Sequence, residues 1–245
     1  LLPNPFYQVY LAATLSVAAQ PHLVTARAAN GFLPDYASLS PDVLNRTAIA
    51  YICSPSNPQG AVASPAYLKS LIELAETYDF KIFADECYSE IYRKGAPSGA
   101  LQIANRIGAD PERVVVFHSL SKRSDLPGLR SGFAASGPQT IARMKHLRAY
   151  SGAPLPLPLQ RVAEAVWADE QHVIENRGLY QEKFYIADAL FGSVPGYISP
   201  DAGFFLWLPV EDGEQAALDL WRETGIRVLP GAYLARDTPD AVSYT

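Results

Sequence analysis

The chain has 245 residues and a formal net charge of −5, with 49% hydrophobic and only 18% charged residues. This composition excludes a disordered chain, which would be poor in apolar residues and rich in charge, and it predicts a large buried core. The acidic balance offers no basic stripe for nucleic acid, the two cysteines are too few for a disulfide scaffold, and no apolar run reaches the length of about 18 residues that a membrane span needs.

Short apolar runs alternate with segments of helical spacing along the chain. The expected helices cover residues 6–19, 65–75, 138–150, 159–190 with a break near Asp169, and 214–224. The expected strands cover residues 21–26, 47–53, 80–84, 113–117, 132–135, 203–208 and 226–229. Turn-forming residues predict a loop over 54–60, and prolines predict a bend over 152–158.

The central strands lack polar alternation, which is typical of strands buried on both faces. With helices between them, they predict an α/β fold, in which a mostly parallel sheet with helices on both faces is followed by a smaller α+β domain. We place the large domain at residues 1–179 and the small domain at 180–245. Neither end of the sequence looks like the edge of a domain, so we expect the chain to be truncated at both ends. The expected location is the cytoplasm, with reduced thiols.

Polar side chains follow three of the expected strands at the point where each strand ends. Ligands of open α/β sheets bind beyond the carboxyl ends of the strands, so these groups converge if the strands are neighbours. In chain order they are Asn57, Asp85, Tyr88, Ser119, Ser121 and Lys122, with Arg130 eight residues after the lysine.

The side chains of this set suit one particular cofactor. The Lys122 amine can form a Schiff base with an aldehyde. Arg130 and the serine hydroxyls suit a phosphate group. Asp85 at the end of a buried strand needs a cationic partner. Pyridoxal phosphate has an aldehyde, a phosphate and a protonated ring nitrogen, and it is therefore the predicted cofactor.

The order and spacing of these motifs resemble a known family. Asn57 begins the sequence NPQG, Asp85 begins DECY, and Lys122 ends SLSK. The chain resembles the fold-type-I pyridoxal-phosphate aminotransferases of class I/II, and in particular their succinyldiaminopimelate aminotransferase branch. The resemblance implies amino transfer between an amino acid and a 2-oxo acid, in a homodimer without nucleic acid or membrane partners.

The resemblance also implies roles for the candidate catalytic residues. Lys122 resembles the lysine that holds the cofactor aldehyde and later moves the substrate Cα proton. Asp85 resembles the partner of the ring nitrogen. Tyr88 and Asn57 resemble the hydrogen-bond partners of the ring O3′ atom.

Further residues resemble the family's binding residues. Ser119 and Arg130 match its phosphate ligands, and Ser121 is adjacent to them. Tyr7 matches an aromatic residue that stacks on the ring, with Phe6 as the alternative.

Two family features have no counterpart in the sequence. The phosphate loop of the family precedes Leu1, and neither Arg227 nor Arg236 has the context of the arginine that binds the substrate carboxylate. The residues that hold the cofactor do not distinguish amino transfer from a C–S lyase or other chemistry of the same cofactor. A non-catalytic truncated remnant is the alternative from another functional class.

Overall fold

The computed structural model describes residues 1–236, 243 and 244. Its helices are α1 (Gln8–Ser16), α2 (Pro41–Leu44), α3 (Pro65–Tyr78), α4 (Ala100–Ile107), α5 (Leu120–Arg123), α6 (Pro138–Tyr150), α7 (Leu157–Ala168), α8 (Gln171–Phe191) and α9 (Gly213–Thr224). Its strands are β1 (Leu2–Asn4), β2 (Leu23–Thr25), β3 (Ile49–Cys53), β4 (Lys81–Asp85), β5 (Val114–Ser119), β6 (Gly132–Ala135), β7 (Leu208–Pro209) and β8 (Ser243–Tyr244).

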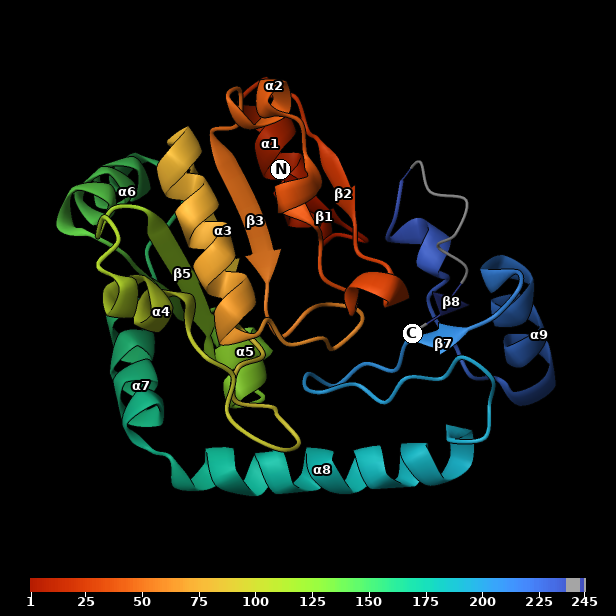
Figure 1. The fold of residues 1–245 in the computed structure, drawn as a ribbon. Helices are drawn as coiled ribbons and strands as arrows, with labels where there is room; N and C mark the ends of the chain where they lie inside the picture. The colour runs from red at the N-terminus through yellow and green to blue at the C-terminus, as the bar shows by residue number, and fades with distance from the viewer. Residues whose placement is uncertain (237–242, 245) are drawn as a thin grey trace.

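The central sheet has the strand order β3-β4-β5-β6, in which the first three strands are parallel and β6 is antiparallel to β5. Strands β1 and β2 form a parallel pair beside β3 (Figure 1). A backbone hydrogen bond from Tyr51 N to the Leu1 carbonyl, at 3.0 Å, connects this pair of strands to β3 of the central sheet. The mostly parallel sheet of an α/β protein is thereby confirmed.

Helices cover both faces of this sheet. On one face, α3 and α4 bury the main core against β3, β4 and β5, and Ser64 caps α3 by accepting a hydrogen bond from Tyr67 N at 3.1 Å. On the other face, α1 packs through Tyr10, whose ring stacks on Tyr51 with a centroid separation of 4.7 Å. Tyr51 remains partly exposed, so α1 covers only part of this face.

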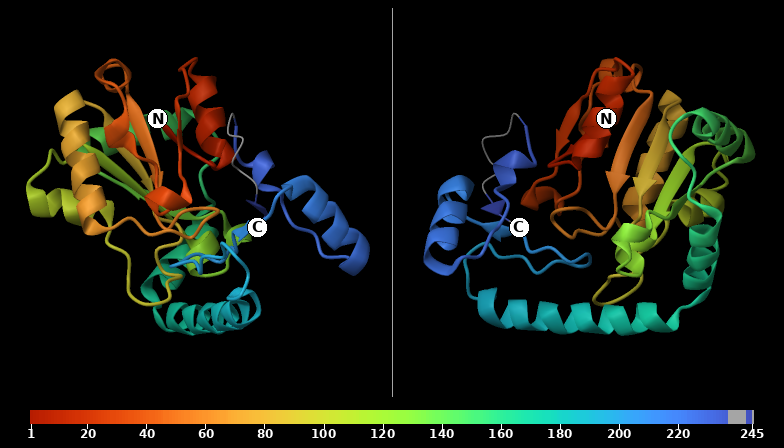
Figure 2. Two further views of the ribbon diagram at one scale, coloured as in Figure 1. Left: turned by 45° about the vertical axis from the view of Figure 1, so that its right-hand side comes forward. Right: turned by 180° about the vertical axis from the view of Figure 1, so that it is seen from behind.

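Helix α8 runs past the carboxyl ends of the strands and leads to the C-terminal segment with α9 and β7 (Figures 1 and 2). This segment returns to the loop after β4, where Gly203 N donates to the Ile91 carbonyl at 2.7 Å and Arg93 N donates to the Asp201 carbonyl at 3.1 Å. The expected domain boundary at residue 180 falls within α8. The division into two domains stays a prediction.

Two expected strands are wrong. Only Leu208 of the run 203–208 lies in a strand, and residues 226–229 form none. Gly203 has a φ of +82°, outside the extended region, and both Phe204 and Phe205 contact the Tyr88 ring. A strand would direct two successive side chains to opposite faces, so this contact with a single ring requires an irregular segment.

Candidate active site

The three polar loops meet at one edge of the sheet. Cys53 of β3 is in register with Asp85 of β4, which is in register with Phe117 of β5. Because the three strands are parallel and end at about the same level, the segments that follow them lie next to one another, on the side facing α8 (Figure 1). This is the arrangement that the sequence predicts for Asn57, Asp85 and Lys122.

Asp85 is held at the end of β4 by two donors. Its Oδ1 atom accepts a hydrogen bond from Cys87 N at 3.1 Å, and its Oδ2 atom accepts one from the Tyr10 hydroxyl at 2.5 Å. Each carboxylate oxygen offers two acceptor positions, so the group retains capacity for a further donor.

Tyr88 and Asn57 form a polar pair next to Asp85. Asn57 Nδ2 donates to the Tyr88 hydroxyl across 3.4 Å, a long hydrogen bond between the loops after β3 and β4. The Tyr88 side chain is buried, and burial, followed by the nearby Cys53 and Asp85, raises its pKa. The phenol therefore stays protonated and remains a hydrogen-bond donor in neutral solution.

Lys122 extends from the short helix α5 toward the same region. Its Nζ atom lies 4.9 Å from the centroid of the Phe204 ring, which also packs edge-on against Tyr88 at 5.4 Å. Burial and the nearby Asp85 raise the pKa of the Cys87 thiol, and the positive charge of Lys122 acts on it in the opposite direction. The Phe204 ring thus contacts both Lys122 and Tyr88, which places the Lys122 amine beside the loop that follows Asp85.

The two serines are together, whereas Arg130 points elsewhere. Ser119 caps α5 by accepting from Ser121 N at 3.1 Å, and the hydroxyl oxygens of the two serines lie 2.9 Å apart, within hydrogen-bond distance. The Arg130 guanidinium is exposed and donates to the Pro127 carbonyl at 2.7 Å. The neighbouring Ser131 carbonyl accepts from the Ser119 hydroxyl at 3.2 Å, so the Arg130 backbone is close to the serines although its side chain is not directed to them.

Of the two aromatic candidates for ring stacking, only Tyr7 is accessible. The Tyr7 side chain is 44% exposed and packs edge-on against Tyr10 at 5.6 Å. Phe6 is buried in a small apolar cluster with Leu2 and Leu11. The structure therefore favours Tyr7 over Phe6 for contact with a ligand.

Tyr10 is a site residue that the motifs in the sequence do not identify. The one sequence feature that indicates its position is its spacing of three residues from Tyr7, because residues three apart lie on the same face of a helix. The structure also places the ring of Phe204, a residue of the expected strand 203–208, against Lys122.

The donor set fits pyridoxal phosphate. It combines an amine from Lys122, a carboxylate from Asp85, the amide–phenol pair, and two hydroxyls at the start of α5. These groups correspond to the aldehyde, the ring nitrogen, the ring hydroxyl and the phosphate of that molecule. Within residues 1–236, 243 and 244, no group of His, Cys, Asp and Glu side chains has a geometry that could hold a metal ion.

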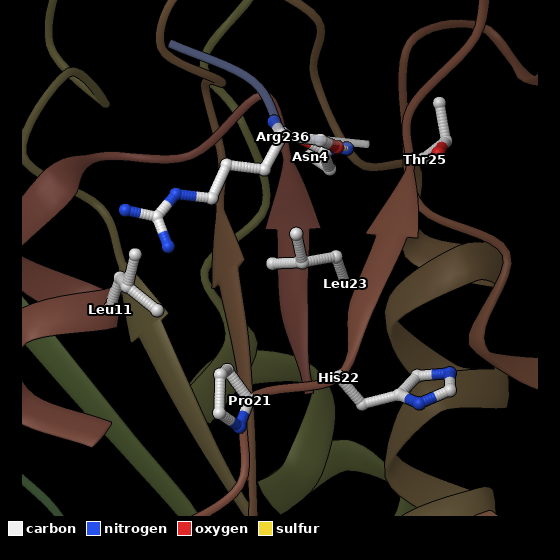
Figure 3. A pocket seen from close by; sticks show the side chains of 7 residues that line it. All are labelled: Asn4, Leu11, Pro21, His22, Leu23, Thr25 and Arg236. Atoms are coloured by element: carbon white, nitrogen blue, oxygen red, sulfur yellow. Dashed lines mark hydrogen bonds between the residues drawn. The ribbon is translucent and has the colours of Figure 1, made fainter. Parts of the chain in front are cut away.

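A separate pocket lies over β1 and β2 (Figure 3). Asn4 lines it and makes two hydrogen bonds to the backbone of Arg236, one from Asn4 Nδ2 to the carbonyl at 2.7 Å and one from Arg236 N at 3.1 Å. Leu11 and His22 lie on opposite sides of it (Figure 3). Its lining includes none of the expected cofactor residues.

Among the helices of the described part of the chain, none is both long and apolar enough to cross a membrane.

Comparison with known proteins matches the chain to aminotransferases, both by a family model and by individual relatives. The family model for aminotransferase class I and II matches residues 1–239. An LL-diaminopimelate aminotransferase of Moorella thermoacetica is 32% identical over 94% of this chain and 60% of its own length. The chain thus spans about 60% of the length of the curated relatives it matches.

Solved structures agree with the fold. An aminotransferase from Neisseria meningitidis superposes with a TM-score of 0.93 at 43% identity, covering 99% of this chain and 63% of the other. A probable N-succinyldiaminopimelate aminotransferase from Thermus thermophilus superposes with a TM-score of 0.88, covering 99% of this chain and 65% of the other. At 24% identity, this second match shows the fold alone.

Proposed function

Because the chain belongs to the class I and II aminotransferase family, we propose that it binds pyridoxal phosphate and transfers an amino group between an amino acid and a 2-oxo acid. The observation that carries the proposal is the convergence of Lys122 and Asp85 on one end of the sheet, with the pair Asn57–Tyr88 beside them. Bound pyridoxal phosphate supplies an aldehyde that condenses with amines and a ring that withdraws electrons from the substrate Cα.

Lys122 has two tasks in this proposal. Its amine would hold the cofactor through the aldehyde carbon and, when freed by an incoming amino acid, would take the substrate Cα proton. The Phe204 ring against Nζ limits the directions in which the lysine can move and excludes water from one side of it.

The remaining residues bind and orient the cofactor. The Asp85 carboxylate would accept the ring N–H, and Asn57 with Tyr88 would bind the ring oxygen O3′. Tyr7 stacks on the face of the ring. The hydroxyls of Ser119 and Ser121 bind the phosphate, and Arg130 joins them by turning its guanidinium away from Pro127.

The relatives suggest the class of amino donor. A diaminopimelate-type amino acid, which carries a second amino acid group at the far end of its chain, is the proposed donor, with 2-oxoglutarate as the proposed acceptor. The free LL-isomer and the N-succinyl form are both candidates. We also propose a homodimer and a cytoplasmic location.

Replacement of Lys122 tests the proposed function. The wild-type chain is mixed with pyridoxal phosphate, and its visible absorption and the formation of 2-oxo acid are followed with a panel of amino donors. Lys122→Ala should remove the protein-bound visible absorption and slow amino transfer by at least about a thousandfold, since the group that anchors the cofactor and moves the proton is lost.

A surface lysine provides the control. Lys69 on α3 is exposed and pairs with Glu73 at 3.6 Å, so Lys69→Ala should leave both signals unchanged. Equal turnover by Lys122→Ala and the wild type contradicts the proposal. Release of pyruvate from a cysteine conjugate, without amino exchange, would instead identify a C–S lyase.

A further inference from the structure

Tyr10 has a buried hydroxyl group that the proposed mechanism does not use. It lies on α1, only 6% of the side chain is exposed, and its hydroxyl donates to Asp85 Oδ2 at 2.5 Å. We infer that Tyr10 is a positioning residue, which fixes the Asp85 carboxylate in the orientation that presents an oxygen to the cofactor ring nitrogen. This inference rests on the proposed function, because it concerns the same cofactor.

The physical basis is the freedom of the carboxylate. The last torsion of an aspartate side chain has a broad energy profile, so one hydrogen bond leaves the plane of the carboxylate poorly defined. Asp85 has two donors from different parts of the fold, Cys87 N from its own loop and the Tyr10 hydroxyl from α1. Two donors on two oxygens define the plane.

Tyr10 itself is held firmly. Its ring stacks on Tyr51 at 4.7 Å with an interplanar angle of 18°, and Tyr7 packs against it edge-on at 5.6 Å. The hydroxyl therefore has little freedom to leave Asp85. Because Tyr7 is the proposed stacking residue, α1 would place both the face and the nitrogen edge of the ring.

The protonation state of Tyr10 is suited to this task. Burial raises the pKa of Tyr10 well above its ordinary value, and the neighbouring Cys53 and Asp85 act in the same direction. The phenol consequently stays protonated in neutral solution. An ionised carboxylate can only accept hydrogen bonds, so the direction of this bond is fixed.

The test compares two ligands in one variant. Tyr10→Phe retains the stacked ring and removes only the donor. The first ligand is pyridoxal phosphate, and the second is its 1-deaza analogue, in which a C–H group replaces the ring nitrogen. Tyr10→Phe should weaken binding of pyridoxal phosphate about tenfold, the loss typical of one hydrogen bond to a charged group, and should change binding of the analogue less than about twofold.

Tyr67→Phe is the matched control. The Tyr67 hydroxyl donates to the Pro34 carbonyl at 2.6 Å, on the other face of the sheet, so its removal should not affect either ligand. In the Asp85→Asn background, the additional Tyr10→Phe change should no longer alter binding of pyridoxal phosphate. This cycle isolates the coupling between the two side chains.

Each outcome decides the inference. Equal weakening of both ligands by Tyr10→Phe would show a general structural role and overturn it, as would unchanged affinity for both. A wild-type chain that binds neither ligand would contradict the proposed function itself, and the inference with it. Selective loss of pyridoxal phosphate binding supports both.

Discussion

The Glu86 carboxylate connects three elements behind the candidate site, and its Oε2 atom lies 3.2 Å from His118 Nε2. Its other oxygen accepts a hydrogen bond from Ala100 N at 2.6 Å, at the start of α4. Glu86 directly follows Asp85 in the sequence, and His118 directly precedes Ser119. The pair therefore connects the ends of β4 and β5 on the side of the sheet opposite Asp85.

Replacement of Glu86 should lower the free energy of unfolding, by an amount that depends on which of its hydrogen bonds the new side chain can still make. Glu86→Leu leaves Ala100 N and His118 without their acceptor and should lower the free energy of unfolding by about 2–4 kcal/mol. Glu86→Gln retains an acceptor oxygen for Ala100 N and should cost about 1 kcal/mol or less. Urea denaturation measures both. An equal loss in the two variants would show that the hydrogen bonds do not account for the effect.

Asp188 connects α8 to the C-terminal segment and makes stability depend on pH. The hydroxyls of Tyr197 and Ser199 donate to its Oδ1 atom at 2.8 and 2.6 Å, and Arg93 forms an ion pair with its Oδ2 atom. Burial acts to raise the pKa of Asp188, but Ser199, Tyr197 and Arg93 together lower it below the ordinary aspartate value. A lowered folded-state pKa means that the carboxylate stabilises the fold above its unfolded pKa and loses this effect as the pH falls through the folded-state pKa.

Asp188→Asn should therefore lower the free energy of unfolding by an amount that depends on pH. At pH 7 we expect a loss of about 1–2 kcal/mol in the free energy of unfolding. The difference from the wild type should begin to shrink near the unfolded aspartate pKa of about 4 and should decline further as the pH falls through the lower folded-state pKa. Urea titrations at several pH values give the comparison. A difference that persists unchanged at low pH would contradict this explanation.

Gly60 joins the loop of Asn57 to the C-terminal segment. Its carbonyl accepts hydrogen bonds from Asp201 N and Ala202 N, each at 3.1 Å. Gly60 has a φ of +70°, and a Cβ atom there would lie 2.5 Å from Pro200 Cβ and 2.6 Å from the Ala202 carbonyl oxygen. No side chain fits between these two segments without moving one of them.

Gly60→Ala should therefore lower the free energy of unfolding by more than backbone strain alone would. Gly31 has a similar φ of +61° but open space around it, so Gly31→Ala measures the backbone strain, about 1–2 kcal/mol. Gly60→Ala should lose at least about 2 kcal/mol more, because the backbone contact with residues 200–202 must open. Thermal or urea unfolding tests the difference. Equal losses at the two glycines would disprove the role of the contact.

The sequence predicts the sheet and the location of the candidate site well, for a physical reason. Buried parallel strands are recognisable as uninterrupted apolar runs, and their carboxyl ends meet at one edge, so Asn57, Asp85 and Lys122 could be brought together without coordinates. The antiparallel direction of β6 has no such signal. Neither does the side-chain direction of Arg130, which depends on its local contact with Pro127.

The failures have equally specific causes. The run 203–208 has the apolar composition of a strand, but its aromatic side chains pack on Tyr88 and Lys122, which no local pattern encodes. Strand β1 is absent from the expected elements because Pro3 and Asn4, two of its three residues, are residue types that are rare in strands. The contact between Tyr10 and Asp85 joins residues 75 positions apart and follows only from the packing of α1 on the sheet.

The most direct test of the account is to identify the lysine that captures the cofactor. The chain is mixed with one equivalent of pyridoxal phosphate, reduced with borohydride to fix the cofactor to the amine it has condensed with, and digested for peptide mass spectrometry. We predict that the label is on Lys122 alone and that the Lys122→Ala variant carries none. Label distributed over surface lysines such as Lys69 and Lys145, with Lys122 unmodified, would contradict the account.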